Sequence, residues 1–139
     1  MQYLILNRMD ARKSTYQREA PDTAIISITD INRKNNEFYP QEWLKALLEI
    51  KFADVTEGQP GCITRAQAKE IADFANEIQD NCERLIVHCE YGQSRSAAVA
   101  AAISKFFEGH DSGIHKNPAY HPNRTCFQYV LDALRGRSK

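Results

Sequence analysis

The sequence has no excess of charge of either sign. Its 18 lysine and arginine residues balance 18 aspartate and glutamate residues, so the formal net charge is zero. A neutral chain creates no overall field that attracts nucleic acid or anionic lipid, and we expect neither as a partner. The chain also lacks an apolar run near the roughly 20 residues that a membrane-spanning helix needs, so we expect no membrane span.

The N-terminal residues lack the features of an export signal. The apolar stretch at residues 3–6 has no charged start and no small-residue cleavage site, so we interpret it as a first strand. We therefore expect a cytoplasmic protein. The four cysteines form no CxxC pair and no zinc-finger spacing. In a reducing compartment they remain free thiols, and we interpret Cys62, Cys82 and Cys126 as small buried residues.

The length and composition describe one globular unit. With 139 residues, 42% of them hydrophobic and 26% charged, the chain is long enough for one core and too short for two ordinary domains. We expect residues 1–139 to form a single domain and the protein to be a monomer.

Short apolar runs alternate with amphipathic segments along the chain. Strands are predicted at residues 3–6, 23–28, 48–52 and 85–87, and the last run is apolar enough for a strand covered on both faces. Thr64 and Gln67 have the spacing of a capping box that begins a helix. Residues 96–107 are helix-forming and apolar nearly all round, and a last helix is predicted from residue 122. This order predicts an α/β fold with a central, mostly parallel sheet flanked by helices.

The segment from Leu85 to Ser96 carries the chemistry. It reads Leu-Ile-Val-His-Cys-Glu-Tyr-Gly-Gln-Ser-Arg-Ser and places a tight loop between the central strand and the buried helix. Backbone N–H groups of such a loop and of the helix start point inward and attract an anion. Arg95 adds a planar fork that suits two phosphate oxygens. We therefore predict a phosphate-binding loop, whose five inner residues are Glu90, Tyr91, Gly92, Gln93 and Ser94.

Cys89 lies at the start of this loop and experiences the same positive field. Its pKa is expected to fall from about 8.5 toward the range of roughly 3.5–7.5 found for cysteines beside cations or helix N-termini. The loop that binds a phosphate dianion thus also produces the thiolate that attacks it. We expect Ser96 to donate a hydrogen bond to the departing thiolate. We expect His88 to orient the loop through backbone hydrogen bonds and to help hold the thiolate.

This pattern resembles the signature of the cysteine-based protein tyrosine phosphatase superfamily. His88-Cys89, five residues that include Gly92, and then Arg95-Ser96 match that signature, and the ending Gly-Gln-Ser-Arg-Ser is especially similar to the small dual-specificity branch. The resemblance extends from about residue 24 to the last helix and leaves the first 20 residues outside it.

The resemblance implies a general acid on a loop after a strand, roughly 30–35 residues before the nucleophile. Asp54 meets this description, and Glu57 is the alternative acid. The chain departs from the branch by having Ala53 before this aspartate and a longer glycine- and proline-containing segment after it. Asn123 is interpreted either as a support of the phosphate loop or as a plain helix cap.

The implied function is hydrolysis of phosphate monoesters through a cysteinyl-phosphate intermediate, without a metal or another cofactor. Phosphotyrosine is the first candidate substrate, on a protein or as a small monoester, with phosphoserine and phosphothreonine as further ones. No loop position between Cys89 and Arg95 is basic, which favours substrates with a single phosphate. The alternatives are a catalytically weak phosphate-binding module and, less favoured, a rhodanese-type sulfurtransferase.

Three further features of the sequence each have two interpretations. His110, His115, His121 and Cys126 are close in sequence, but their spacing matches no ordinary zinc site and favours a polar loop. Trp43 belongs either to a minor core or to a substrate-binding lip. The ring of Tyr91 either lines the rim of the pocket or packs behind the loop.

Overall fold

The computed structural model describes residues 1–136. Its sheet has four parallel strands in the spatial order β1-β4-β2-β3. The strands are β1 (Gln2–Leu6), β2 (Thr23–Thr29), β3 (Leu44–Lys51) and β4 (Arg84–His88). The predicted α/β fold with a mostly parallel sheet is confirmed, and β4 occupies a central position between β1 and β2.

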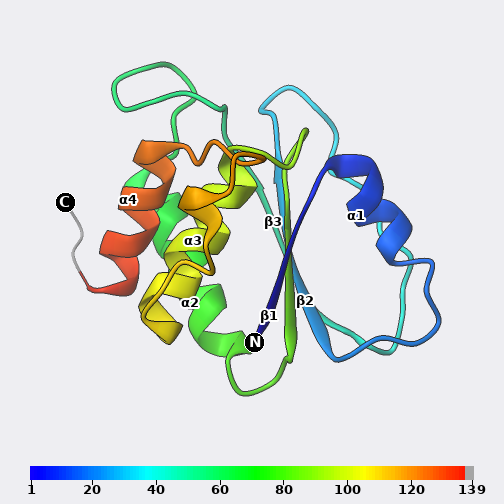
Figure 1. Cartoon of the computed structure of the whole chain (residues 1–139). Helices are drawn as coiled ribbons and strands as arrows, with labels where there is room; N and C mark the ends of the chain where they lie inside the picture. The colour runs from blue at the N-terminus through cyan, green and yellow to red at the C-terminus, as the bar shows by residue number, and fades with distance from the viewer. Residues whose placement is uncertain (137–139) are drawn as a thin grey trace.

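The helices lie on both faces of the sheet (Figure 1). The helix α1 (Arg8–Ser14) covers one face, and α2 (Arg65–Ile78), α3 (Arg95–Glu108) and α4 (Arg124–Leu134) pack on the other. A short 3-10 helix, η1 (Ile114–Lys116), precedes α4. None of the helices within residues 1–136 is long and apolar enough to cross a membrane.

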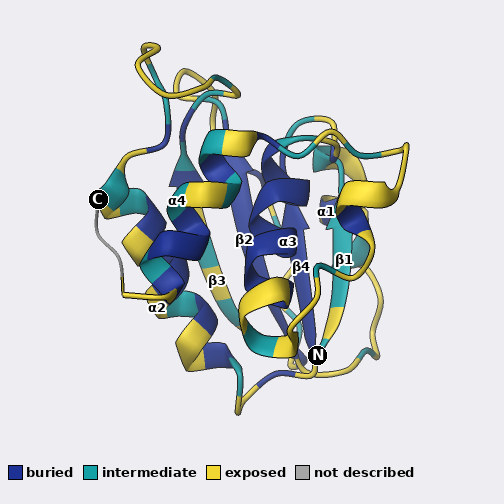
Figure 2. Cartoon of the chain, turned by 60° about the vertical axis from the view of Figure 1, so that its left-hand side comes forward, coloured by how far each residue is buried: buried dark blue, intermediate teal, exposed yellow. Residues whose placement is uncertain are grey.

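The main core lies between the sheet and the layer formed by α2, α3 and α4. Every residue of β2 and β4 is buried, and so is α3 from Arg95 to Ser104, as the dark blue ribbon in Figure 2 shows. The prediction that residues 96–107 form a buried central helix is therefore confirmed over most of their length. On the other face, Ala11 of α1 packs with Ile25 and Ile86 in a smaller cluster.

Two helix starts follow the predicted capping chemistry. The Thr64 hydroxyl accepts from the Gln67 amide, and the Gln67 side chain accepts from the Thr64 amide, both at 3.0 Å, so the capping box before α2 is confirmed. At α4 the side chain of Asn123 accepts from the Cys126 amide at 3.0 Å. These caps satisfy backbone N–H groups that have no partner within the helix.

Two elements differ from the sequence-based expectation. The helix α1 was not predicted, because Ala11 is its only buried residue and a single apolar position produces no helical periodicity. The strand β3 begins at Leu44, four residues before the predicted start, and ends at Lys51. It is an edge strand whose side chains alternate between half-buried and exposed. Leu47 is apolar but exposed, so the apolar run Ala46-Leu47-Leu48 hides the alternation by which a strand is predicted. Trp43, just before β3, is 5% exposed and donates to the Gln17 carbonyl at 2.9 Å, which confirms the minor-core interpretation.

Candidate active site

The predicted phosphate loop joins the carboxyl end of β4 to the start of α3. Ligand sites of open parallel sheets lie at this end of the strands. Gly92 lies in the middle of the loop with a φ of +69°, a conformation that glycine adopts without strain. A Cβ atom at this position would come within 2.8 Å of backbone atoms of Leu6 and Asn7. The loop therefore rests directly on the end of β1, and only a glycine permits that contact.

Cys89 is 3% exposed at the start of the loop. Its Sγ lies 3.1 Å from the Ser96 hydroxyl oxygen, at the first turn of α3. Burial alone would raise the pKa of the Cys89 thiol. Hydrogen bonds from the Ser96 hydroxyl and from the amides of Ser96 and Gly92, together with the charge of Arg95, outweigh burial and lower this pKa. The site therefore favours a thiolate.

Within the described residues, the guanidinium of Arg95 is hydrogen-bonded to the protein through Nη1 but not through Nε. Its Nη1 donates to the Asp30 carboxylate and to the Phe52 carbonyl, each at 2.7 Å, which uses both hydrogens of that nitrogen. The buried Nε has no hydrogen-bond partner within residues 1–136. Buried N–H groups are rarely left unpaired. The Nε–Nη2 edge of the guanidinium is therefore the side that remains for an oxyanion, and it can donate two parallel hydrogen bonds.

His88 is fully buried at the end of β4. Its Nε2 lies 2.6 Å from the Ser27 hydroxyl, and its Nδ1 lies 3.2 Å from the Cys89 carbonyl. Burial lowers the pKa of His88 to about 4, and the charges of Arg8 and Arg95 act in the same direction. The neutral ring with its proton on Nδ1 satisfies both contacts, donating to the Cys89 carbonyl and accepting from Ser27. Both ring nitrogens thus bind groups other than the Cys89 thiol, and His88 holds the loop backbone.

Asp54 reaches the loop from the segment that follows β3. Its Oδ1 accepts from the Ser94 hydroxyl at 2.8 Å and from the Asn123 side-chain amide at 2.9 Å. Asn123 therefore does two things, because its oxygen caps α4 while its nitrogen contacts Asp54. Oδ1 accepts both of these bonds, whereas Oδ2 accepts no side-chain hydrogen bond from residues 1–136. The carboxylate of Glu57 instead accepts from the Tyr129 hydroxyl at 2.5 Å, on the α4 side.

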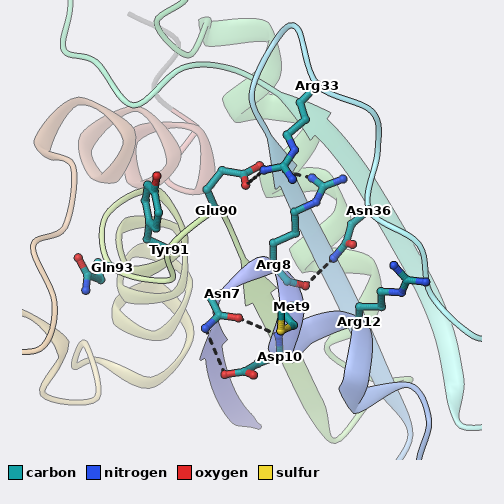
Figure 3. A pocket seen from close by; sticks show the side chains of 10 residues that line it. All are labelled: Asn7, Arg8, Met9, Asp10, Arg12, Arg33, Asn36, Glu90, Tyr91 and Gln93. Atoms are coloured by element: carbon teal, nitrogen blue, oxygen red, sulfur yellow. Dashed lines mark hydrogen bonds and ion pairs between the residues drawn. The ribbon is translucent and has the colours of Figure 1, made fainter.

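The side chains of Glu90 and Tyr91 line a pocket of about 510 Å³ beside the phosphate loop (Figure 3). Glu90 is held there by ion pairs with Arg8 and Arg33, and its side chain is 9% exposed. Tyr91 is 81% exposed and lines this neighbouring pocket, so its ring does not pack behind the loop. Gln93 lines the same pocket. The side chains of Glu90, Tyr91 and Gln93 therefore line this neighbouring pocket, which includes neither Cys89 nor Arg95.

Several residues around the loop escaped the sequence analysis. Arg8 and Arg33 hold Glu90, Asp30 holds Arg95, and Ser27 contacts His88. None of them belongs to a local motif, and each meets the loop only through the fold. The weak signal available was position, because Ser27 lies at the carboxyl end of the strand predicted at residues 23–28 and Asp30 follows two residues after that strand. In a parallel sheet, such strand ends lie side by side at the edge that carries the site.

No metal site accompanies the loop in the described part of the chain. Within residues 1–136, no group of three or more histidine, cysteine, aspartate or glutamate side chains could hold a metal ion. The Nδ1 of His115 lies 2.7 Å from the Asp111 carboxylate, within the polar segment between α3 and α4. All four cysteines are free thiols.

Comparison with solved structures finds the same fold elsewhere. Human DUSP28 superposes with a TM-score of 0.64 and 13% sequence identity, over 96% of this chain and 92% of that one. A mouse putative dual specificity phosphatase complexed with zinc tungstate superposes with a TM-score of 0.61 and 17% sequence identity, over 94% of this chain and 80% of that one. The chain has the dual-specificity phosphatase fold. PTPMT1 in complex with PI(5)P also has this fold, with a TM-score of 0.59 and 19% identity over 97% and 91% of the two chains.

The dual-specificity phosphatase fold includes the N-terminal segment that the sequence resemblance left out. The alignments to DUSP28 and PTPMT1 cover 96% and 97% of this chain, and β1 pairs with the central strand β4 along its whole length. No family model and no curated protein matches the sequence.

Proposed function

We propose that this protein is a cysteine-dependent phosphatase that hydrolyses phosphate monoesters. The observation that carries the proposal is the pairing of two features in one loop. A cysteine with a lowered pKa lies at its start, and at its end lies an arginine whose buried Nε has no hydrogen-bond partner among residues 1–136. A nucleophile beside a prepared oxyanion site is what phosphoryl transfer requires. The shared fold with dual-specificity phosphatases supports the same proposal.

In the first step, the Cys89 thiolate attacks phosphorus and forms an S–P bond while the P–O bond to the leaving group breaks. The Nε–Nη2 edge of Arg95 and the loop amides bind the non-bridging oxygens. Asp54 delivers its proton to the departing oxygen, which leaves as an alcohol or phenol. A positioned acid of this kind accelerates such a step by about 10²–10⁴-fold.

In the second step, water attacks the cysteinyl-phosphate, and Asp54 now accepts a proton from that water. The new O–P bond forms as the S–P bond breaks, which releases inorganic phosphate and regenerates the thiolate. The Ser96 hydroxyl, 3.1 Å from Sγ, stabilises the negative sulfur as it leaves. Both proton transfers use one carboxyl group, so the acid and base are regenerated in each cycle.

Phosphotyrosine is the substrate we propose first, with phosphoserine and phosphothreonine as further substrates. The ring of Tyr91 is exposed next to the loop and offers an aromatic surface on which a phenyl leaving group can pack. The nucleophile must remain a reduced thiol, so we also propose that the protein works in a reducing compartment such as the cytoplasm.

The decisive experiment compares wild type with Cys89→Ser. Turnover of p-nitrophenyl phosphate should disappear, because a serine hydroxyl stays protonated where the thiol ionises. Tungstate, a phosphate-like oxyanion, should still bind, since Arg95 and the loop amides remain. Tungstate binding without any wild-type turnover would instead identify a phosphate-binding module. Sulfur transfer from thiosulfate by the wild type would identify a sulfurtransferase.

A further inference from the structure

A single turn between β2 and β3 contacts both ends of the phosphate loop. The Arg33 amide donates to the Asp30 carbonyl at 3.1 Å, which closes a turn over residues 30–33. The Asp30 carboxylate lies 2.7 Å from Nη1 of Arg95, at the end of the loop. The Arg33 guanidinium pairs with the Glu90 carboxylate at the start of the loop (Figure 3). The turn thus makes two ion pairs of opposite polarity, one with each end.

The contact with Asp30 determines how Arg95 faces the loop. The side chain of Arg95 is 5% exposed, whereas that of Asp30 is 43% exposed, so a buried arginine is held by an aspartate that solvent reaches. Nη1 is bound from two directions, by Asp30 and by the Phe52 carbonyl. Two acceptors on one nitrogen fix the plane of the guanidinium and leave its Nε edge open. Without Asp30, only the Phe52 carbonyl would remain.

We infer that Asp30 is a positioning residue for Arg95, and that Arg33 plays the same part for Glu90. The inference rests on the proposed phosphatase function. A guanidinium held in place before the substrate arrives loses no orientational freedom when charge develops on the phosphoryl oxygens. Arg33, together with Arg8, likewise compensates the carboxylate next to Cys89, which would otherwise oppose thiolate formation.

Kinetics on a series of aryl phosphates tests the part assigned to Asp30. Asp30→Ala should lower kcat/KM by about 10- to 100-fold, because the charged hydrogen bond that orients Arg95 is lost. The loss should be equal for good and poor leaving groups, since Arg95 acts on the phosphoryl oxygens. Asp30→Asn should recover most of the rate, because its amide oxygen still accepts from Nη1. A loss that grows with the pKa of the leaving group would overturn the inference and make Asp30 an acid.

A double-mutant cycle shows whether Asp30 acts through Arg95. In an Arg95→Lys background, Asp30→Ala should cause less than about a twofold further loss, because the fork that it orients is already absent. The full single-mutant loss in that background would overturn the inference. Asp73→Asn is the control, since it removes the charge of an exposed aspartate of α2 whose one ion-pair partner in the described part of the chain is Lys69. It should leave kcat/KM unchanged.

Arg33 has a matched control in the same pocket. Arg33 and Arg12 have similar side-chain exposures of 54% and 51%, but Arg12 pairs with Glu37 and not with the loop. Arg33→Gln should lower kcat/KM severalfold, and Arg12→Gln should leave it unchanged. Equal effects of the two variants would show that only the general charge of the pocket matters.

Tungstate affinity tests the positioning separately from turnover. By charge alone, removing the Asp30 carboxylate should strengthen the binding of an anion. If Asp30 positions Arg95, the affinity for tungstate should instead fall by about tenfold in folded Asp30→Ala and stay unchanged in Asp30→Asn. An unchanged or stronger affinity in Asp30→Ala would overturn the inference. If the wild type binds tungstate but does not turn over phosphate esters, the proposed function fails while this test still decides the part of Asp30.

Discussion

Replacing Gly92 by alanine should separate the two reasons why the phosphate loop needs a glycine. The first reason is conformational, since φ at this position is +69°. The second is steric, because an added Cβ would lie 2.7 Å from the Asn7 nitrogen and 2.7 Å from the Leu6 carbonyl carbon. Both contacts are with backbone atoms, which cannot move aside as a side chain can. Relief therefore requires a shift of the loop away from β1.

The two contributions have different magnitudes. A left-handed conformation costs an ordinary residue roughly 1–2 kcal/mol, and overpacking costs typically about 1–3 kcal/mol. Gly92→Ala should thus lower the free energy of unfolding by about 2–5 kcal/mol. Gly109→Ala is the matched control, because Gly109 has a φ of +82° but no heavy atom within 4 Å of the added Cβ. Gly109→Ala should therefore lower the free energy of unfolding only by the conformational contribution, about 1–2 kcal/mol.

Urea unfolding of the three proteins measures both losses, and the difference between the two variants isolates the steric part. The folded fraction of Gly92→Ala should also turn over p-nitrophenyl phosphate more slowly than Gly109→Ala, since the shift displaces the loop amides around Cys89. Equal stability losses in the two variants, with wild-type turnover in both, would refute the close approach between the loop and β1.

Four further predictions follow from the same geometry. Arg95→Lys should lower kcat/KM by orders of magnitude, because lysine keeps the charge but not the two-pronged Nε–Nη2 edge; a near wild-type rate would make Arg95 merely structural. Asp54→Asn should slow the hydrolysis of phosphotyrosine more than that of aryl phosphates with acidic leaving groups, and it should flatten the alkaline limb of the pH profile of kcat/KM. Equal slowing of all substrates with that limb intact would show that another carboxylate is the general acid. Micromolar peroxide should inactivate the enzyme reversibly by oxidising Cys89 to a sulfenic acid, and mass spectrometry should find Cys89 more reactive than the other cysteines. The folded-state pKa of His88 is about 4 against an ordinary 6.5, so the unfolded chain takes up a proton first as the pH falls. This residue's contribution to stability is complete above pH 6.5 and is lost between pH 6.5 and about 4, by about 3 kcal/mol. Urea unfolding across that range should show a smaller loss in His88→Gln than in wild type.

The sequence predicted what is local in the chain. Cys89, Gly92, Arg95 and Ser96 lie within one strand–loop–helix unit, so their spacing already determines that they face one another. The capping box before α2 was predictable for the same reason, since its two residues are three positions apart. Such short-range geometry depends little on the rest of the fold.

The residues that hold the loop from outside could not be predicted in this way. Asp30 and Arg95 are 65 positions apart, and Arg8 and Glu90 are 82 apart, so only the strand order brings them together. Three arginines line the pocket beside the loop although no inner loop position is basic. The sequence of the loop alone therefore does not reveal the positive charges that surround it in the fold. Asp54 was predictable only through the family resemblance, and the structure places it in contact with Ser94 of the loop.

Trapping the covalent intermediate tests the central claim most directly. Rapid acid quench of the Asp54→Asn variant with p-nitrophenyl phosphate, followed by peptide mapping, should find one phosphate on Cys89, formed with a burst of nitrophenol. This variant suits the experiment because breakdown of the intermediate needs the general base, while this leaving group departs with little help from an acid. Steady turnover without phosphate on Cys89, or with phosphate on another residue, would contradict the account.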